Sequence, residues 1–106
     1  MIDLSNKEIF LGMPSYDGKC TTRAARGYWN ASNQRITHAD KAGSLLAATF
    51  NALWCCALNA DPRVDYFAMQ HADIEPEDFW LDALIDEMES HDLDVLGVAV
   101  PIKDST

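Results

Sequence analysis

The sequence lacks the features that mark membrane, secreted and repeat proteins. Its longest apolar run, residues 44–60, contains two asparagines, which makes it short and polar for a membrane span. The first ten residues carry early charges and no apolar segment of the kind that a signal peptide needs. No internal repeat or low-complexity tract is present. We therefore expect a cytoplasmic, globular protein without a membrane span.

Cysteine and basic residues are also scarce. The three cysteines, Cys20, Cys55 and Cys56, lack the spacing of a zinc site. Cys55 and Cys56 fall inside the apolar run, where free cysteines are usually buried, so we expect both to be reduced core residues. The chain has 8 Lys and Arg against 17 Asp and Glu, a net charge of −9. This balance argues against a nucleic-acid partner.

The charges are unevenly placed. The span from Asp73 to Asp94 is rich in acidic residues and has no Lys or Arg, and we interpret it as a solvated helix face. Near the other end of the chain, Lys19, Arg23 and Arg26 would share one face of a helix at spacing i, i+4, i+7. That basic face is either a solvated surface or a set of contacts to a diphosphate.

A chain of 106 residues has room for one small hydrophobic core, so we expect residues 1–106 to form a single domain. Apolar and β-branched runs predict strands at 8–14, 64–70 and 93–100, with at most a short strand at 35–38. Helices are predicted at 20–32, at 44–59 and from Pro76 to His91. Because helix 44–59 is apolar nearly all round, we expect it in the interior, with Trp54 in the core.

Alternating strands and helices predict an α/β fold, in which helices cover a mostly parallel sheet to give three layers. Sheets of this kind bind ligands outside the carboxyl ends of their strands. Three loops fall at these ends, at residues 14–18, 71–76 and 101–106. The second loop, HADIEP, places His71 and Asp73 at the edge where a ligand would bind.

Four segments together resemble one protein family. They read IFLGMPSYDGK, then GSLLAATFNALWCCALN, then VDYFAMQHADIEPEDFWLDALIDEM, and finally LDVLGVAVPIKD. In this order they resemble the nucleotide-binding half of a glycosyltransferase of the A-type fold, similar to family 2, over residues 8–104. The resemblance implies an incomplete Rossmann-like sheet of the nucleotide-diphospho-sugar transferase type. It also implies a nucleotide-sugar donor, whose sugar would pass to an acceptor that the sequence does not identify.

The resemblance assigns roles to particular residues. Asp73 matches the second aspartate of an Asp-x-Asp motif, which in the family holds a divalent metal, and His71 stands in the place of the first aspartate. The loop that lines the nucleoside matches Pro14, Ser15, Tyr16 and Asp17. A Mn²⁺ or Mg²⁺ ion at such a site neutralises the charge of a departing diphosphate. With histidine at position 71, either Mn²⁺ is favoured over Mg²⁺ or His71 contacts only the sugar or ribose.

The acceptor-binding half of such an enzyme has no counterpart in these residues. We therefore expect a missing C-terminal region or a homo-oligomer, because a sheet that stops after residue 100 leaves an unpaired edge. Catalysis by this chain alone is not expected, and no catalytic residue is assigned. Two other functions stay open. One is a non-catalytic α/β interaction module that binds neither metal nor nucleotide, and the other is a flavodoxin-like or response-regulator-like domain.

Overall fold

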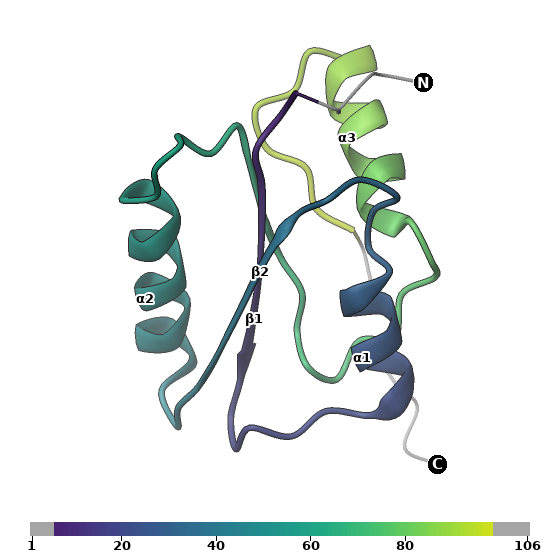
Figure 1. The fold of residues 1–106 in the computed structure, drawn as a ribbon. Helices are drawn as coiled ribbons and strands as arrows, with labels where there is room; N and C mark the ends of the chain where they lie inside the picture. The colour runs from purple at the N-terminus through teal and green to yellow at the C-terminus, as the bar shows by residue number, and fades with distance from the viewer. Residues whose placement is uncertain (1–5, 99–106) are drawn as a thin grey trace.

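The computed structural model describes residues 6–98, which form a three-stranded sheet with helices on both faces (Figure 1). The elements follow the order β1 (Ile9–Ser15), α1 (Thr22–Trp29), β2 (Thr37–Ala42), α2 (Leu46–Leu58), β3 (Tyr66–Met69) and α3 (Trp80–Ser90). The strands lie in the order β2-β1-β3 and all run parallel. Helix α2 covers one face, and α1 and α3 cover the other. A parallel α/β sheet is confirmed, whereas the transferase topology stays a prediction.

Strand β1 is the centre of the fold, because both other strands pair with it. All seven of its residues are buried. Phe10 pairs with Thr37 of β2 on one side and with Phe67 of β3 on the other. Burial on both faces explains why its sequence is an almost continuous apolar run rather than an alternating one.

The main hydrophobic core lies between β1 and the layer formed by α1 and α3. It consists of Ile9, Leu11, Met13, Tyr28, Ala31, Leu81 and Ile85. On the opposite face of the sheet, Gly12 makes room for α2. A Cβ atom added at Gly12 would lie 3.3 Å from Cδ1 of Leu53, so the helix approaches the strand closely at this point.

Helix α2 does not lie in the interior, and this part of the sequence prediction is wrong. Only Thr49, Leu53 and Ala57 are buried. Trp54 is 41% exposed, and both cysteines of the helix, predicted to be core residues, are exposed. The physical reason is that one helix lying on a sheet buries a single stripe of its surface, and no other element among residues 6–98 covers the outer side of α2.

Within residues 6–98, no helix has the length and apolarity needed to cross a bilayer.

Helix α3 begins at Trp80 rather than at Pro76, which is a second correction. The start is fixed by tertiary contacts: the backbone N–H groups of Phe79 and Leu81 donate to the carbonyls of Asn30 and Ala31 at 2.7 and 2.9 Å. The expected end of the helix at His91 is confirmed, since the His91 N–H donates to the carbonyl of Glu87.

Pro76 packs against α1 instead of starting a helix. A Cβ atom added at Gly27 would lie 2.7 Å from Cγ of Pro76 and 2.8 Å from its carbonyl oxygen. Glycine at position 27 therefore allows the loop after β3 to lie directly on α1. In sequence, a proline at the first position of a helix and a proline packed on another helix look the same.

Two strand predictions also need correction. The segment 93–98 forms no strand, and residues 99–106, which include the rest of the predicted strand and the third loop, lie outside the described residues. In contrast, β2 extends over Thr37–Ala42, beyond the short strand expected at 35–38. Its sequence, THADKA, has little apolar character, so pairing with β1 rather than side-chain pattern holds it in the sheet.

The phenol of Tyr28 is buried in the core without a hydrogen-bond partner. Tyr28 is 2% exposed, and its hydroxyl has no partner among residues 6–98. Burial, and secondarily the nearby carboxylate of Asp40, raise the pKa of Tyr28 above its ordinary value of 10. The ring itself is well packed, because it meets the imidazole of His38 edge to face at a centroid distance of 4.6 Å.

The contact between Gly27 and Pro76 gives the first prediction. In an ordinary helix interior, Gly→Ala stabilises by about 1 kcal/mol. For Gly27→Ala we expect the opposite sign, a loss of about 1–3 kcal/mol in the free energy of unfolding, because the added methyl group overlaps Pro76. Urea denaturation measures it. The reciprocal control, Ala25→Gly, should cost about 1 kcal/mol from helix propensity alone. A stabilising Gly27→Ala would contradict the close packing.

The unpaired hydroxyl of Tyr28 gives the second prediction. Tyr28→Phe should leave the free energy of unfolding unchanged or raise it by about 1 kcal/mol, since it removes a buried polar group that gains no hydrogen bond. Tyr66→Phe is the matched control, because the Tyr66 hydroxyl donates to the carboxylate of Glu89. That variant should lose about 0.5–1.5 kcal/mol.

The same two tyrosines predict how stability depends on pH. Burial, followed by the hydrogen bond to Glu89, raises the pKa of Tyr66 to about 12. Both phenols hold their protons more tightly in the folded than in the unfolded state. Their contribution to the free energy of unfolding is therefore complete below pH 10 and is lost as the pH rises above 10. Tyr28→Phe should reduce this alkaline loss in urea titrations, and an unchanged loss in that variant would contradict the assignment.

Candidate functional site

The carboxyl ends of β1 and β3 form the edge of the sheet where a ligand would bind. With strand order β2-β1-β3, the chain leaves β1 toward one side and later returns on its other side. The connections that follow the neighbouring strands β1 and β3 thus lead away from each other at this edge. In doubly wound sheets, this arrangement leaves a crevice between the two strand ends. A cleft of about 480 Å³ lies there. Its lining consists of Pro14, Ser15, Tyr16, Asp17, Lys19, Cys20, Thr21, Leu46, His71, Ala72 and Asp73.

All six residues that the sequence predicted for the site line this one cleft. Four of them, Pro14 to Asp17, come from the end of β1 and the loop that follows it. His71 and Asp73 come from the loop after β3, more than fifty positions later in the chain. The fold brings the two loops together because their strands are parallel neighbours.

The loop after β1 is held by its own side chains. The Ser15 hydroxyl accepts a hydrogen bond from the Gly18 N–H at 3.1 Å, and Oδ1 of Asp17 accepts one from the Lys19 N–H at 3.1 Å. Gly18 has φ of 79°, a left-handed conformation that suits glycine. Ser15 and Asp17 therefore shape the turn. Tyr16, which is 74% exposed, is left available to contact a ligand.

The loop after β3 is anchored by Gln70, a residue that sequence reasoning missed. Its N–H donates to the Gly12 carbonyl at 2.9 Å, and its side-chain Nε2 donates to the Ala24 carbonyl at 2.9 Å. Gln70 is 4% exposed, and its Oε1 has no partner among residues 6–98. The available signal was a polar residue at the end of an apolar run. Beyond this anchor, both His71 and Asp73 are exposed to solvent.

Helix α1 begins beside the cleft and connects its two sides. Thr21 caps the helix, accepting a hydrogen bond from the Ala24 N–H at 3.1 Å, and its hydroxyl donates to Oε2 of Glu75 at 3.4 Å. An N-terminal helix end carries partial positive charge, which favours anions nearby. The start of α1 lies at the cleft, because Thr21 lines it together with His71 and Asp73.

The three basic residues predicted to share one face have different surroundings. Lys19 lines the cleft. Arg26 instead forms an ion pair with Asp78, with 3.2 Å between Nη2 and Oδ2. Arg23 is exposed and is not part of the lining. Of the three, Lys19 is therefore the side chain that lies at the cleft.

Residues 6–98 supply at most two metal ligands at this edge. Within residues 6–98, no group of three or more His, Cys, Asp or Glu side chains could hold a metal ion. His71 and Asp73 would be the protein ligands. Such a pair fits a divalent cation whose remaining ligands are water and phosphate oxygens, as Mg²⁺ is commonly held by one or two carboxylates and its substrate. It does not fit a metal held by protein alone.

Comparison with known proteins identifies no relative: no family, no curated protein and no solved structure matches the chain. The glycosyltransferase resemblance and the roles that it assigns to His71 and Asp73 therefore stay predictions.

The two-ligand edge gives the fourth prediction. Mn²⁺ alone should bind weakly, without saturation below millimolar concentration, because two exposed side chains cannot complete its coordination. Adding a nucleoside diphosphate should produce saturable Mn²⁺ binding, which water-proton relaxation or calorimetry would detect. Tight binding of one Mn²⁺ per chain without nucleotide would contradict the two-ligand assignment.

Proposed function

We propose that this chain is the donor-binding portion of a nucleotide-sugar-dependent glycosyltransferase. The observation that supports it is the meeting of two distant loops at one cleft, at the carboxyl ends of adjacent parallel strands. Nucleotides bind at this position in open α/β sheets. The cleft volume of about 480 Å³ also falls in the range of about 300–1,000 Å³ that is usual for small-molecule sites.

Each wall of the cleft has a part in the proposed binding. The exposed ring of Tyr16 contacts the nucleoside, while Lys19 and the first turn of α1 attract the diphosphate. Asp73, with His71, holds the divalent cation. When bound, that cation neutralises charge on the departing diphosphate. The chain's own contribution is to orient the donor, and no residue among 6–98 is assigned as a catalytic base.

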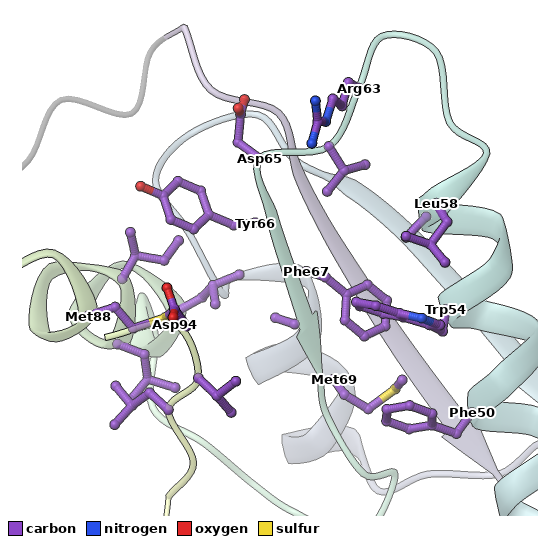
Figure 2. Close-up of a pocket in the computed structure, with 18 of the residues that line it drawn as sticks. Phe50, Trp54, Leu58, Arg63, Asp65, Tyr66, Phe67, Met69, Met88 and Asp94 are labelled. Atoms are coloured by element: carbon purple, nitrogen blue, oxygen red, sulfur yellow. The ribbon is translucent and has the colours of Figure 1, made fainter. Parts of the chain in front are cut away.

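A non-catalytic interaction module is the second candidate. The observation that favours it is an apolar groove of about 730 Å³ beside β3, larger than the cleft and lined mainly by aromatic and aliphatic side chains (Figure 2). Exposed apolar surface of this extent often marks a protein interface. The two candidates differ in whether a nucleotide stabilises the fold.

The fifth prediction separates these two functions by thermal melting. Uridine or guanosine diphosphate with Mn²⁺ should raise the melting temperature. A ligand present at one hundred times its dissociation constant adds about 2.7 kcal/mol of stability. Nucleotide without Mn²⁺ should have a smaller effect, because the diphosphate charge is then unscreened beside Asp73. No shift with either nucleotide, in a preparation that melts cooperatively, would favour the interaction module.

Site variants sharpen the same test by calorimetric titration of Mn²⁺ and nucleoside diphosphate. Asp73→Asn keeps the side-chain shape but removes the charge that a hard cation needs, so affinity should fall by about ten- to a hundred-fold. His71→Ala should cost less and change the preference between Mn²⁺ and Mg²⁺ if His71 is a ligand. Asp92→Asn, at an exposed position outside the cleft, is the matched control. Equal binding by all variants would reject the site.

A further inference from the structure

The two edges of the sheet differ in how well they resist pairing with another strand. Edge strand β2 carries Asp40 and Lys41, and charged residues of this kind discourage pairing between edges. Edge strand β3 reads Tyr-Phe-Ala-Met over Tyr66–Met69 and has no charged residue. No other strand among residues 6–98 pairs with its outer side. Within residues 6–98, the edge without charged residues is therefore that of β3.

The backbone of β3 is arranged to pair further. The amides of Tyr66 and Gln70 donate inward, to the carbonyls of Glu8 and Gly12 of the β1 segment. Because residues of a strand alternate in the direction of their backbone groups, those of Phe67 and Met69 point to the open side. These two residues present their backbone donors and acceptors at the floor of the apolar groove.

Mostly apolar side chains wall this groove on both faces of the strand, and Arg63, Asp65 and Asp94 also line it. On one side are Phe50, Trp54 and Leu58 of α2, and on the other Trp80, Leu84 and Met88 of α3. Figure 2 shows Phe67 and Met69 on the side of Phe50 and Trp54. The Phe67 ring meets Trp54 edge to face at a centroid distance of 4.8 Å. A strand added beside β3 would thus be covered above and below, as strands inside α/β sheets are.

We propose that the occupant of this groove is β3 of a second copy of the chain. The two strands pair antiparallel across a two-fold axis near Phe67, so that the sheets of both copies become continuous. In this arrangement Phe67 lies opposite the partner's Phe67, and an aromatic cross-strand pair of this kind stabilises a sheet. Leu58 and Trp54 of both copies then cover the junction on one face. A two-fold interface uses the same surface twice, which the self-pairing of one strand satisfies.

The distribution of charge favours a second copy at this edge. The chain has a net charge of −9, so two copies repel over most of their surface. Residues 42–60, which include all of α2, contain no charged residue, and the α2 side of the groove is therefore free of that repulsion. Charges of both signs flank β3: Arg63 and Asp65 precede the strand, and Asp73 follows it. Antiparallel pairing brings Arg63 to the turn that carries the partner's Asp73.

Sedimentation velocity over a range of concentrations, without ligand, tests the proposal independently of donor binding. The wild type should form a dimer. Leu58→Lys should weaken dimerisation by about tenfold or more, because a lysine would be desolvated beside the paired edge. The matched control is Trp29→Lys on α1, on the opposite face of the sheet. Leu58 is 65% exposed and Trp29 63%, so neither change should unfold the chain, which circular dichroism checks.

A charge exchange tests the antiparallel direction. Arg63 and Asp73 are both exposed, and neither forms an ion pair within the part of the chain that the structure describes. Arg63→Glu and Asp73→Arg should each weaken the dimer by about three- to tenfold, as the two-fold axis repeats a modest surface interaction twice. The double variant should recover wild-type affinity. A monomer at every concentration, a dimer insensitive to Leu58→Lys, or a double variant as weak as the single ones would overturn the proposal.

Discussion

Burial of β1 on both faces and along both edges is the constraint on which the other elements depend. A strand with seven buried residues must find partners for its backbone groups inside the protein, and β2 and β3 provide them. Once these two strands are fixed, helices must cover both faces of the sheet. The loops that leave β1 and β3 must also emerge at the same edge. The location of the cleft follows from the packing of one apolar heptapeptide.

The sequence predicts the two apolar strands well and the rest less well, for physical reasons. Strands β1 and β3 are short runs of apolar and aromatic residues, and their length and aromatic content favour a strand over a buried helix. Strand β2 has no such apolar pattern, and it forms because its backbone pairs with β1. The periodicity of α2 indicates that the helix is apolar, but it does not indicate whether any element covers its outer side. Periodicity describes a side chain's neighbours on its own element, whereas burial depends on elements that lie far away in sequence.

For the candidate site too, the sequence predicts the features that depend on strand ends but not those that depend on distant contacts. A general rule for parallel sheets is enough to bring His71 and Asp73 close to the loop at Pro14–Asp17, because it concerns strand ends alone. No rule of spacing distinguishes Lys19, which lines the cleft, from Arg26, which pairs with an aspartate 52 positions away. Gln70 was missed for a similar reason: its partner is a backbone carbonyl of α1.

Helix α1 makes contact with the loop that follows β3 at several points. Ala24 accepts the hydrogen bond from Gln70, Thr21 donates to Glu75, and Gly27 receives Pro76. The helix itself continues directly from the loop after β1. The loops after β1 and β3, which form the two walls of the cleft, are thus both attached to α1. They cannot separate without breaking these contacts. A ligand would encounter a preorganised site, so little conformational entropy would be lost on binding and no closing motion would limit its association rate.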